Sequence, residues 1–237
     1  MNNPQAPLSY NNQVTGTQEE IQHAFITRVY GWMTAGLIVT TMAALLTASV
    51  PALMDAIQSN PFIFLGLIVT ELVVVVVLTW AINRFSPLMA GLLFIGYAVL
   101  NGITFSVILL MYTPVSIGLT FGVTACTFGI MTLFGYTTQR DLTKLGSLLM
   151  MALLGLILAS LANMFFNNPA VYWIVTYVGV LIFVGLIAYD TQRLKRMSLM
   201  MSDDGQTQKA SILGALRLYL DFVNLFLLLL RIVGRRR

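Results

Sequence analysis

Long apolar stretches separated by short polar connections dominate the chain from about residue 29 onward. Runs of about 20 apolar residues, enough to cross the roughly 30 Å hydrocarbon core of a bilayer, cover 29–50, 61–83, 88–110, 115–136, 145–166 and 171–192. A weaker seventh run covers 211–233. Five prolines fall between the runs or at the start of one, where proline begins or ends a helix without removing an internal hydrogen bond: Pro51, Pro61, Pro87, Pro114 and Pro169. The pattern predicts an all-α membrane protein with seven transmembrane helices.

Polar residues gather at both ends of the chain and set the predicted domain limits. Residues 1–26 form an expected disordered tail with a short amphipathic lead-in, 27–233 a single seven-helix membrane domain, and 234–237 a basic tail. The first segment lacks the basic region, apolar stretch and cleavage site of a secretory signal. Hydrophobic residues make up 58% of the chain and charged residues 9%, which the surface of a soluble domain could not accommodate. We therefore expect a multi-pass protein embedded in a lipid bilayer.

The distribution of lysine and arginine predicts how the helices are oriented. Basic residues precede the first run and occupy the second, fourth and sixth connections, but not the first, third and fifth. Because basic connections stay in the cytoplasm, the N-terminus is predicted to be cytoplasmic. An odd number of spans then places the C-terminal arginines, 235–237, outside, against the same rule. The last helix either crosses the membrane surrounded by the other six or re-enters on one side, and we favour a central spanning helix.

The inner ends of the second, fourth and sixth runs resemble one another. They read WAINR at 80–84, YTTQR at 136–140 and YDTQR at 189–193. Interfacial aromatic residues and cytoplasmic arginines also produce such endings independently, so a true repeat and coincidence stay open as alternatives. A repeat favours three hairpins around the unmatched seventh helix. In this register, Asp190 stands where the preceding repeat has Thr137.

Two aspartates interrupt the apolar runs: Asp190 near the inner end of the sixth and Asp221 within the seventh. A carboxylate in a membrane span is costly, and its usual explanation is functional. Arg217, Asp221 and Asn224 lie at i, i+4 and i+7 and therefore share one face of the helix. Since the sixth and seventh runs meet at the same inner surface, the two aspartates can approach and share a proton. Such a pair would form a pH sensor and gate.

Other charged and polar residues are candidates for supporting roles. Counter-ion candidates are Arg84, Arg193 and Arg217. The alternative is that each aspartate only neutralises an arginine near it, Asp190 with Arg193 and Asp221 with Arg217. Further candidates could line an ion path: Glu71, Asn101, Thr104 and Asn224. Stripes of small residues on the fourth and fifth runs, such as Gly118, Gly122 and Gly129, are expected to pack against neighbouring helices.

The residue inventory argues against several other chemistries. The one histidine, His23, lies outside the runs, and with Cys126 as the one cysteine, no Ser/His or Cys/His dyad is expected in the bilayer. No phosphate-binding G-x-x-x-x-G-K-[ST] loop is present. The basic pI near 9.4 follows from arginines at helix ends, so no nucleic-acid partner is expected. We expect neither an enzyme nor a cofactor.

Calcium is the metal ion that the two aspartates could contact. A tight calcium site needs roughly six to eight oxygens and surplus negative charge. The arginines close to Asp190 and Asp221 oppose such a site. Transient calcium contact therefore fits better than a resident ion.

Four segments resemble the bacterial branch of the transmembrane Bax inhibitor motif family: RVYGWMTAGL, FGYTTQRDL, GLIAYDTQRLK and SILGALRLYLDFVNLFLLLLRI. The resemblance covers the chain from about Thr27 onward. It implies a bundle with the last helix in the middle and a pH-sensitive calcium leak governed by aspartates that match Asp190 and Asp221. It also implies an arginine latch on the second span, for which Arg84 is the candidate.

The resemblance leaves two classes of function. We expect a pH-sensitive calcium leak channel of the cell inner membrane, with calcium ions and protons as its ligands. Because other family members restrain cell death or a membrane-bound protease, the alternative is a non-conducting regulator that contacts a membrane protease or another membrane protein. A proton-coupled transporter is a third hypothesis, supported only by the buried acids.

Overall fold

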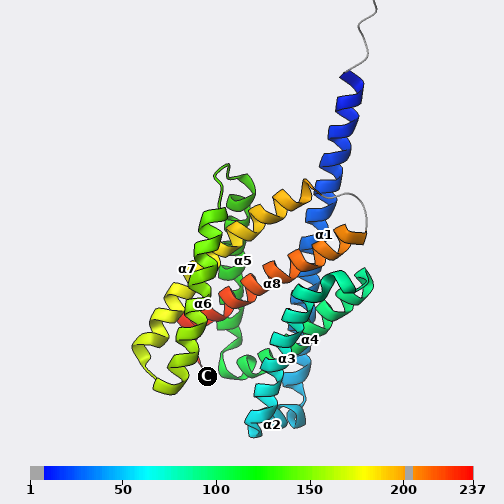
Figure 1. Ribbon diagram of the computed structural model, residues 1–237. Coiled ribbons are helices and arrows are strands. Elements are labelled where there is room, and N and C mark those ends of the chain that lie inside the picture. The colour runs from blue at the N-terminus through cyan, green and yellow to red at the C-terminus, as the bar shows by residue number, and fades with distance from the viewer. Residues whose placement is uncertain (1–7, 201–204, 237) are drawn as a thin grey trace, which may run out of the picture.

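The computed structural model describes residues 8–200 and 205–236, and its long elements are all helices (Figure 1). In chain order they are α1 (Leu8–Ser49), α2 (Pro51–Ser59), α3 (Pro61–Ala81), α4 (Pro87–Met111), α5 (Pro114–Thr137), α6 (Thr143–Phe166), α7 (Pro169–Ser198) and α8 (Gly205–Val233). A 3-10 turn at Ile82–Arg84 follows α3. Within the described residues, 7 helices are long and apolar enough to cross a membrane. The predicted all-α architecture with seven candidate spans is confirmed.

Proline and a polar cap mark the start of four helices. Pro61, Pro87, Pro114 and Pro169 occupy the first turns of α3, α4, α5 and α7, each after a residue whose side chain accepts a hydrogen bond from the first turn. The missing N–H of proline lies where a helix has no internal partner. The helix limits therefore follow the predicted runs closely. Two differences are α1, which begins at Leu8 rather than near residue 29, and α2, a short helix in the first connection that buries Met54 on its inner side.

The N-terminal and C-terminal tails are only partly described. α1 already begins at Leu8, while residues 1–7 and Arg237 lie outside the described residues. The predicted division of the chain into a disordered tail, a membrane domain and a basic tail stays a prediction.

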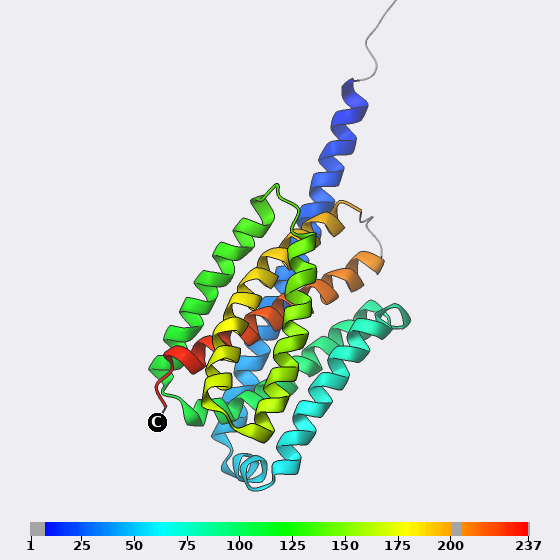
Figure 2. The same ribbon diagram turned by 60° about the vertical axis from the view of Figure 1, so that its left-hand side comes forward.

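The last helix, α8, is the most deeply buried span. In its most apolar window, 67% of residues are buried, against 6% in α3 and in α6. It packs against α1, α4, α5 and α7, and Figures 1 and 2 show it crossing the bundle obliquely. Because neighbouring helices cover most of this helix, its polar residues can reside in a membrane with protein rather than lipid around them.

Contacts at both ends of α8 establish that it runs the full length of the bundle. Near its start, Lys209 Nζ donates to the carbonyl oxygen of Asn83, just before α4 begins (3.3 Å). Just after its end, the Arg235 N–H donates to Ser116 Oγ, beyond the end of α4 (2.9 Å). α8 therefore extends as far as α4, which agrees with a spanning helix and not with a re-entrant one.

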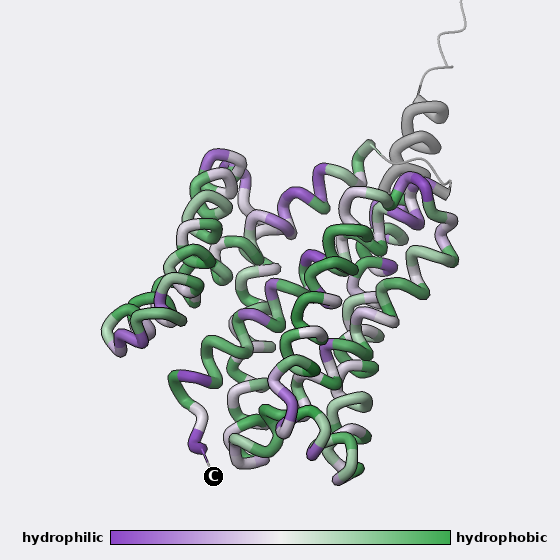
Figure 3. Tube along the Cα trace, turned by 60° about the horizontal axis from the view of Figure 1, so that its bottom comes forward, coloured by the Kyte–Doolittle hydropathy of each residue, from purple (hydrophilic) through white to green (hydrophobic). Residues whose placement is uncertain are grey.

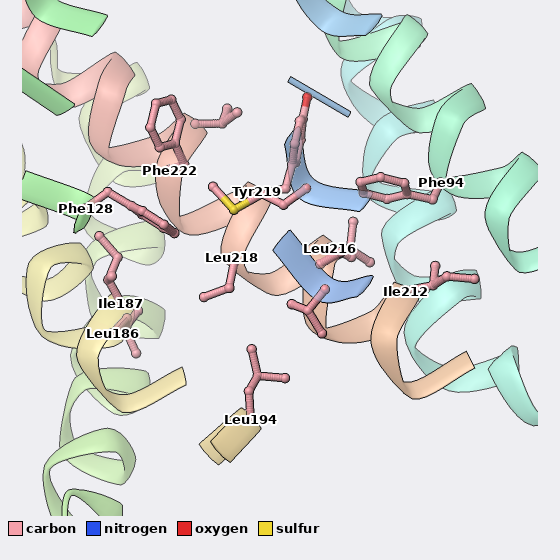
Figure 4. Packing of buried hydrophobic residues seen from close by; sticks show 14 of the residues in the cluster. Phe94, Phe128, Leu186, Ile187, Leu194, Ile212, Leu216, Leu218, Tyr219 and Phe222 are labelled. Atoms are coloured by element: carbon pink, nitrogen blue, oxygen red, sulfur yellow. The ribbon is translucent and has the colours of Figure 1, made fainter. Parts of the chain in front are cut away.

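Aromatic side chains join α8 to the helices around it. Figure 4 shows Tyr219 of α8 beside Phe94 of α4, and the two rings meet edge to face with centroids 5.8 Å apart. The Tyr219 hydroxyl lies 2.7 Å from the hydroxyl of Thr40 in α1, which in turn donates to the Ala98 carbonyl oxygen at 3.0 Å. A buried tyrosine needs such a partner for its polar end. The contact links α1, α4 and α8 at one point.

The predicted grouping into three hairpins is not confirmed. α6 and α7 are packed neighbours, but α1 packs mainly on α4 rather than α3, and α5 on α7 and α8 rather than α4. Gly102 permits the close approach of α1 and α4, since a Cβ atom there would lie 2.5 Å from the Thr40 carbonyl oxygen and 2.6 Å from Ala43 Cβ. Small residues at a crossing point, rather than the order of connections, decide which helices meet.

The predicted packing role of the small-residue stripe on α5 is wrong. A Cβ atom added at Gly118, Gly122 or Gly129 would meet no other atom within 4 Å. The glycine of α5 that does lie against another helix is Gly135, which touches the backbone of Ala188 in α7. Regular spacing identifies a smooth helix face, but it does not identify which face another helix covers.

Hydrophobic side chains cover the outside of the bundle, and Figure 3 shows hydrophilic residues mainly towards helix ends. Exposed residues on the outer helices include Leu72 (62%) and Leu158 (66%). A surface of this kind suits the hydrocarbon of a bilayer and would promote association in water.

Replacing Gly102 by alanine is expected to destabilise the protein because the added methyl group would overlap α1. Overpacking of this kind costs about 1–3 kcal/mol. The matched control is Gly122→Ala, at an open position, which should leave stability unchanged or raise it by up to about 1 kcal/mol through helix propensity. Thermal unfolding in detergent compares the two variants, and equal midpoints would contradict the assigned α1–α4 contact.

Candidate functional site

Asp190 of α7 and Asp221 of α8 lie together inside the bundle. Each residue is only 5% exposed, and their carboxyl groups lie close enough for each to act on the charge of the other. A hydrogen bond between two carboxyl groups requires one of them to carry a proton. Asp190 Oδ1 and Asp221 Oδ2 have no hydrogen-bond partner among the described residues. The pair can therefore hold a shared proton and still offer oxygens to another ligand.

The two aspartates occupy positions that otherwise belong to the apolar core. Asp190 lies one helical turn from Leu186 and from Leu194 on α7, and both leucines are buried. Asp221 lies between the buried Leu218 and Leu225 at i−3 and i+4 on α8. Since residues at these spacings share a helix face, the packing that buries the leucines also directs the carboxyl groups at each other.

Arg217 is the cation nearest to the pair. Its Nη1 atom lies 4.0 Å from Asp190 Oδ1, and its side chain is 35% exposed against 7% for Asp190. The charge of Arg193, an exposed residue of α7, also acts on Asp190. The contact to Arg217 crosses from α7 to α8, which differs from the alternative in which Asp190 pairs with Arg193 on its own helix. These cations offset part of the cost of burying charged carboxylates.

A groove of about 480 Å³ runs beside the pair, between α3, α6, α7 and α8. Four of its lining residues form one polar stripe along α8: Arg217, Asp221, Asn224 and Arg231. A second cavity of about 450 Å³ shares Arg231 and Ser160 with this groove and continues to Asn167 and Tyr172. Where the two meet, the Arg231 guanidinium lies 5.5 Å from the centre of the Tyr172 ring. The groove and this second cavity therefore form a continuous, partly polar path, called the lane below. It leads from the aspartates to the opposite end of α8.

The residues predicted to line an ion path fall into two places. Asn224 lies beside the aspartates, where its Nδ2 atom donates to the Leu220 carbonyl oxygen at 2.8 Å. Glu71 of α3 instead accepts a hydrogen bond from Thr104 of α4 at 2.5 Å. Asn101, also on α4, donates from Nδ2 to the Tyr97 hydroxyl at 2.9 Å. Glu71, Thr104 and Asn101 thus belong to a separate polar group, and none of them lines the groove beside the pair.

Arg84, the candidate latch residue, lies in the 3-10 turn after α3 with its side chain exposed. The cations whose charge acts on Asp190 within the described residues are Arg217 and Arg193. A latch role for Arg84 stays a prediction, whereas Arg217 already occupies the position of a counter-ion.

Sequence reasoning missed a clamp between α7 and the connection 138–142 that follows α5. Gln192 donates from Nε2 to the Arg140 carbonyl oxygen (2.8 Å), and its Oε1 atom accepts from the Leu142 N–H (2.9 Å). Arg196 donates to Asp141 Oδ1 at 2.8 Å. The amide shared by the three similar helix endings was the available signal. The clamp fixes the segment of α7 that carries Asp190.

Asp141 keeps its negative charge over the whole physiological pH range. Hydrogen bonds from the hydroxyl and N–H groups of Thr143, together with Arg196, lower the pKa of Asp141 from its usual 3.8 to about 2. Because the folded-state pKa is lowered, the stabilising contribution of this carboxylate is complete above pH 3.8 and is lost only as the pH falls toward about 2. The clamp therefore supplies no pH response near neutrality.

Sequence comparisons agree with the resemblance found in the four segments. A family model described as "Inhibitor of apoptosis-promoting Bax1" matches residues 22–237. The chain belongs to the Bax inhibitor-1 family. Its Bax inhibitor-1 relatives include the inner membrane protein YbhL of Escherichia coli K12, 49% identical over 215 residues, with 90% of this chain and 92% of that protein covered. A protein of Borreliella burgdorferi is 42% identical over 226 residues, covering 93% of this chain and 97% of its own length.

Replacing Gln192 by alanine is expected to release the connection 138–142 from α7. Loss of two hydrogen bonds predicts about tenfold faster amide exchange in this connection. Hydrogen exchange followed by mass spectrometry of peptides spanning 134–146 measures the effect. The control is Gln139→Ala, an exposed residue of the same connection, and equal exchange in both variants would contradict the clamp.

Proposed function

We propose that this Bax inhibitor-1 family protein is a pH-sensitive calcium leak channel, with Asp190 and Asp221 as its pH sensor and gate. The observation that carries the proposal is the buried pair of neighbouring carboxyl groups, which line the same groove beside a polar stripe. The name of the Escherichia coli relative supports a location in the cell inner membrane. We further propose that α8 is the central helix and that the N-terminus is cytoplasmic.

The gate works through the charge of the pair. With one shared proton, the pair carries a single negative charge, which Arg217 balances from 4.0 Å away. In this state α7 and α8 are held together, and calcium does not pass along the lane. A second proton, taken up in acid, removes the negative charge that attracts Arg217, and any hydrogen bond between the two carboxyl groups becomes a weaker, uncharged one. Calcium flux is therefore expected to rise as the pH falls.

Calcium is the transported ion in this proposal and not a resident one. Within the described residues, no group of three or more His, Cys, Asp or Glu side chains could hold a metal ion. Two carboxyl groups with an arginine beside them provide fewer oxygens and less negative charge than a tight calcium site requires. Asp190 and Asp221 would contact calcium only as it passes.

Asp190→Asn and Asp221→Asn are each expected to remove the rise of calcium flux as the pH falls, because the proton-sharing pair is lost. Asparagine keeps the shape of the side chain but cannot lose or gain the proton. Calcium flux into proteoliposomes, measured with an enclosed dye, provides the comparison. The control is Asp55→Asn, an exposed acid of α2, which should retain the wild-type profile. If calcium flux in both variants depended on pH as in the wild type, the pair would not be the pH sensor.

A second function is favoured by the family description, which names an inhibitor of a protein that promotes cell death. In this alternative the chain is a non-conducting regulator that contacts a membrane protease or another membrane protein. Folded wild-type protein that conducts no calcium at any pH would contradict the channel. Recovery of a stoichiometric partner after crosslinking in native membranes would then support the regulator.

A further inference from the structure

A second large groove, of about 600 Å³, lies between α1, α4, α5 and α8. Its walls include Leu45 of α1 and Gly118 and Phe121 of α5, and Phe226 of α8 lies at its base. Leu45 is 58% exposed and Phe121 44% exposed, whereas Phe226 is only 8% exposed. The groove therefore opens to the outside of the bundle and reaches inward to the most buried helix. Because these segments are candidate membrane spans, the medium that faces the opening is hydrocarbon.

The chain segment after α8 is fixed at one end of this groove. The Thr113 N–H donates to the Arg235 carbonyl oxygen (3.1 Å), and the Arg235 N–H donates to Ser116 Oγ (2.9 Å). Tyr112 and Arg236 form an antiparallel bridge. Pro114 and Ile117, next to these residues in sequence, line the groove itself. Two arginines are thus held at the rim of an apolar groove.

A glycine makes this placement of the tail possible. A Cβ atom on Gly234 would lie 2.7 Å from the ring of Tyr112, so only a residue without a side chain allows the tail to pass this closely. Tyr112 is 6% exposed and packs in one cluster with Phe226 and Leu230 of α8. Since Phe226 also lines the groove, the anchor of the tail and the apolar groove share one set of packed side chains.

The positive charges at this rim are accessible. Arg235 and Arg236 are both exposed. The N-terminus of α5, which begins at Pro114, adds the positive end of its helix dipole at the same place. This end of the bundle lies opposite the end that carries Arg84, since α4 separates them. The excess of lysine and arginine in membrane proteins lies on the cytoplasmic side. Arginines at the opposite end of the bundle therefore favour an anionic binding partner there.

We propose that this groove binds an anionic phospholipid, with one acyl chain between α1 and α5 and the phosphate group on Arg235 and Arg236. Basic residues beside membrane helices recognise anionic head groups, and the apolar groove accepts the attached chain. A soluble anion would use the arginines alone, and a neutral lipid the groove alone. The inference is independent of the proposed channel activity, because none of these residues belongs to the aspartate pair.

Native mass spectrometry of the full-length protein in detergent tests the head-group contact. Phosphatidylglycerol and phosphatidylcholine with identical dioleoyl chains are added separately. One bound phosphatidylglycerol per chain is expected, with about tenfold or greater preference over phosphatidylcholine, since each basic residue near an anionic lipid contributes roughly fivefold in affinity. R235Q/R236Q should lose this preference and still bind phosphatidylcholine like the wild type. The control R140Q/K144Q removes two charges beyond the other end of α5 and should keep the preference.

A substitution that fills the groove with a larger side chain tests the acyl-chain contact. Gly118→Leu places a side chain into the open space of the groove, whereas Gly129→Leu makes the same change at another open position of α5 that does not line it. Gly118→Leu should weaken binding of both lipids about tenfold or more, because the chain would lose most of its buried area, and Gly129→Leu should bind like the wild type. Equal binding of the two lipids by the wild type, unchanged binding by Gly118→Leu, or displacement by inorganic phosphate alone would each overturn the proposal.

Discussion

The burial of α8 by the helices around it is the condition on which the other features of this protein depend. This helix carries Arg217, Asp221, Asn224 and Arg231 within one candidate span, and a span with so many polar residues would be expelled from hydrocarbon if lipid surrounded it. Packing against α1, α4, α5 and α7 replaces lipid by protein. The outer helices α3 and α6 need no such protection, because their exposed surfaces are apolar.

The different faces of α8 serve different purposes. One face presents the stripe from Arg217 to Arg231 to a groove and brings Asp221 against Asp190. Another carries Tyr219, whose ring and hydroxyl bind the helix to α4 and α1. The apolar and aromatic contacts therefore hold the helix in place independently of the polar face. In the proposed gate, a carboxyl pair supported in this way would change its charge without loss of the fold.

At both ends of the bundle, hydrogen bonds outside the hydrophobic core join a helix to a neighbouring segment. At one end, Gln192 and Arg196 tie the connection 138–142 to the segment of α7 that carries Asp190. At the other end, the backbone of Arg235 is tied to the start of α5. The first contact limits how far α7 can move relative to α5, and the second links the end of α8 to the rim of a groove that faces lipid. Changes at the aspartate pair and changes in the surrounding lipid would therefore both act on α8.

The sequence by itself determined the number and limits of the spans, since about 20 apolar residues between prolines can form little other than membrane helices. It also singled out Asp190 and Asp221, because acids are rare in such segments, and the family followed from the segments around them. Only the tertiary structure decided that Arg217 rather than Arg84 lies beside Asp190, that Glu71 pairs with Thr104 away from the aspartates, and that α1 packs on α4. The physical reason is that periodicity specifies the faces of one helix, whereas the partner of each face depends on side-chain packing between segments far apart in the chain.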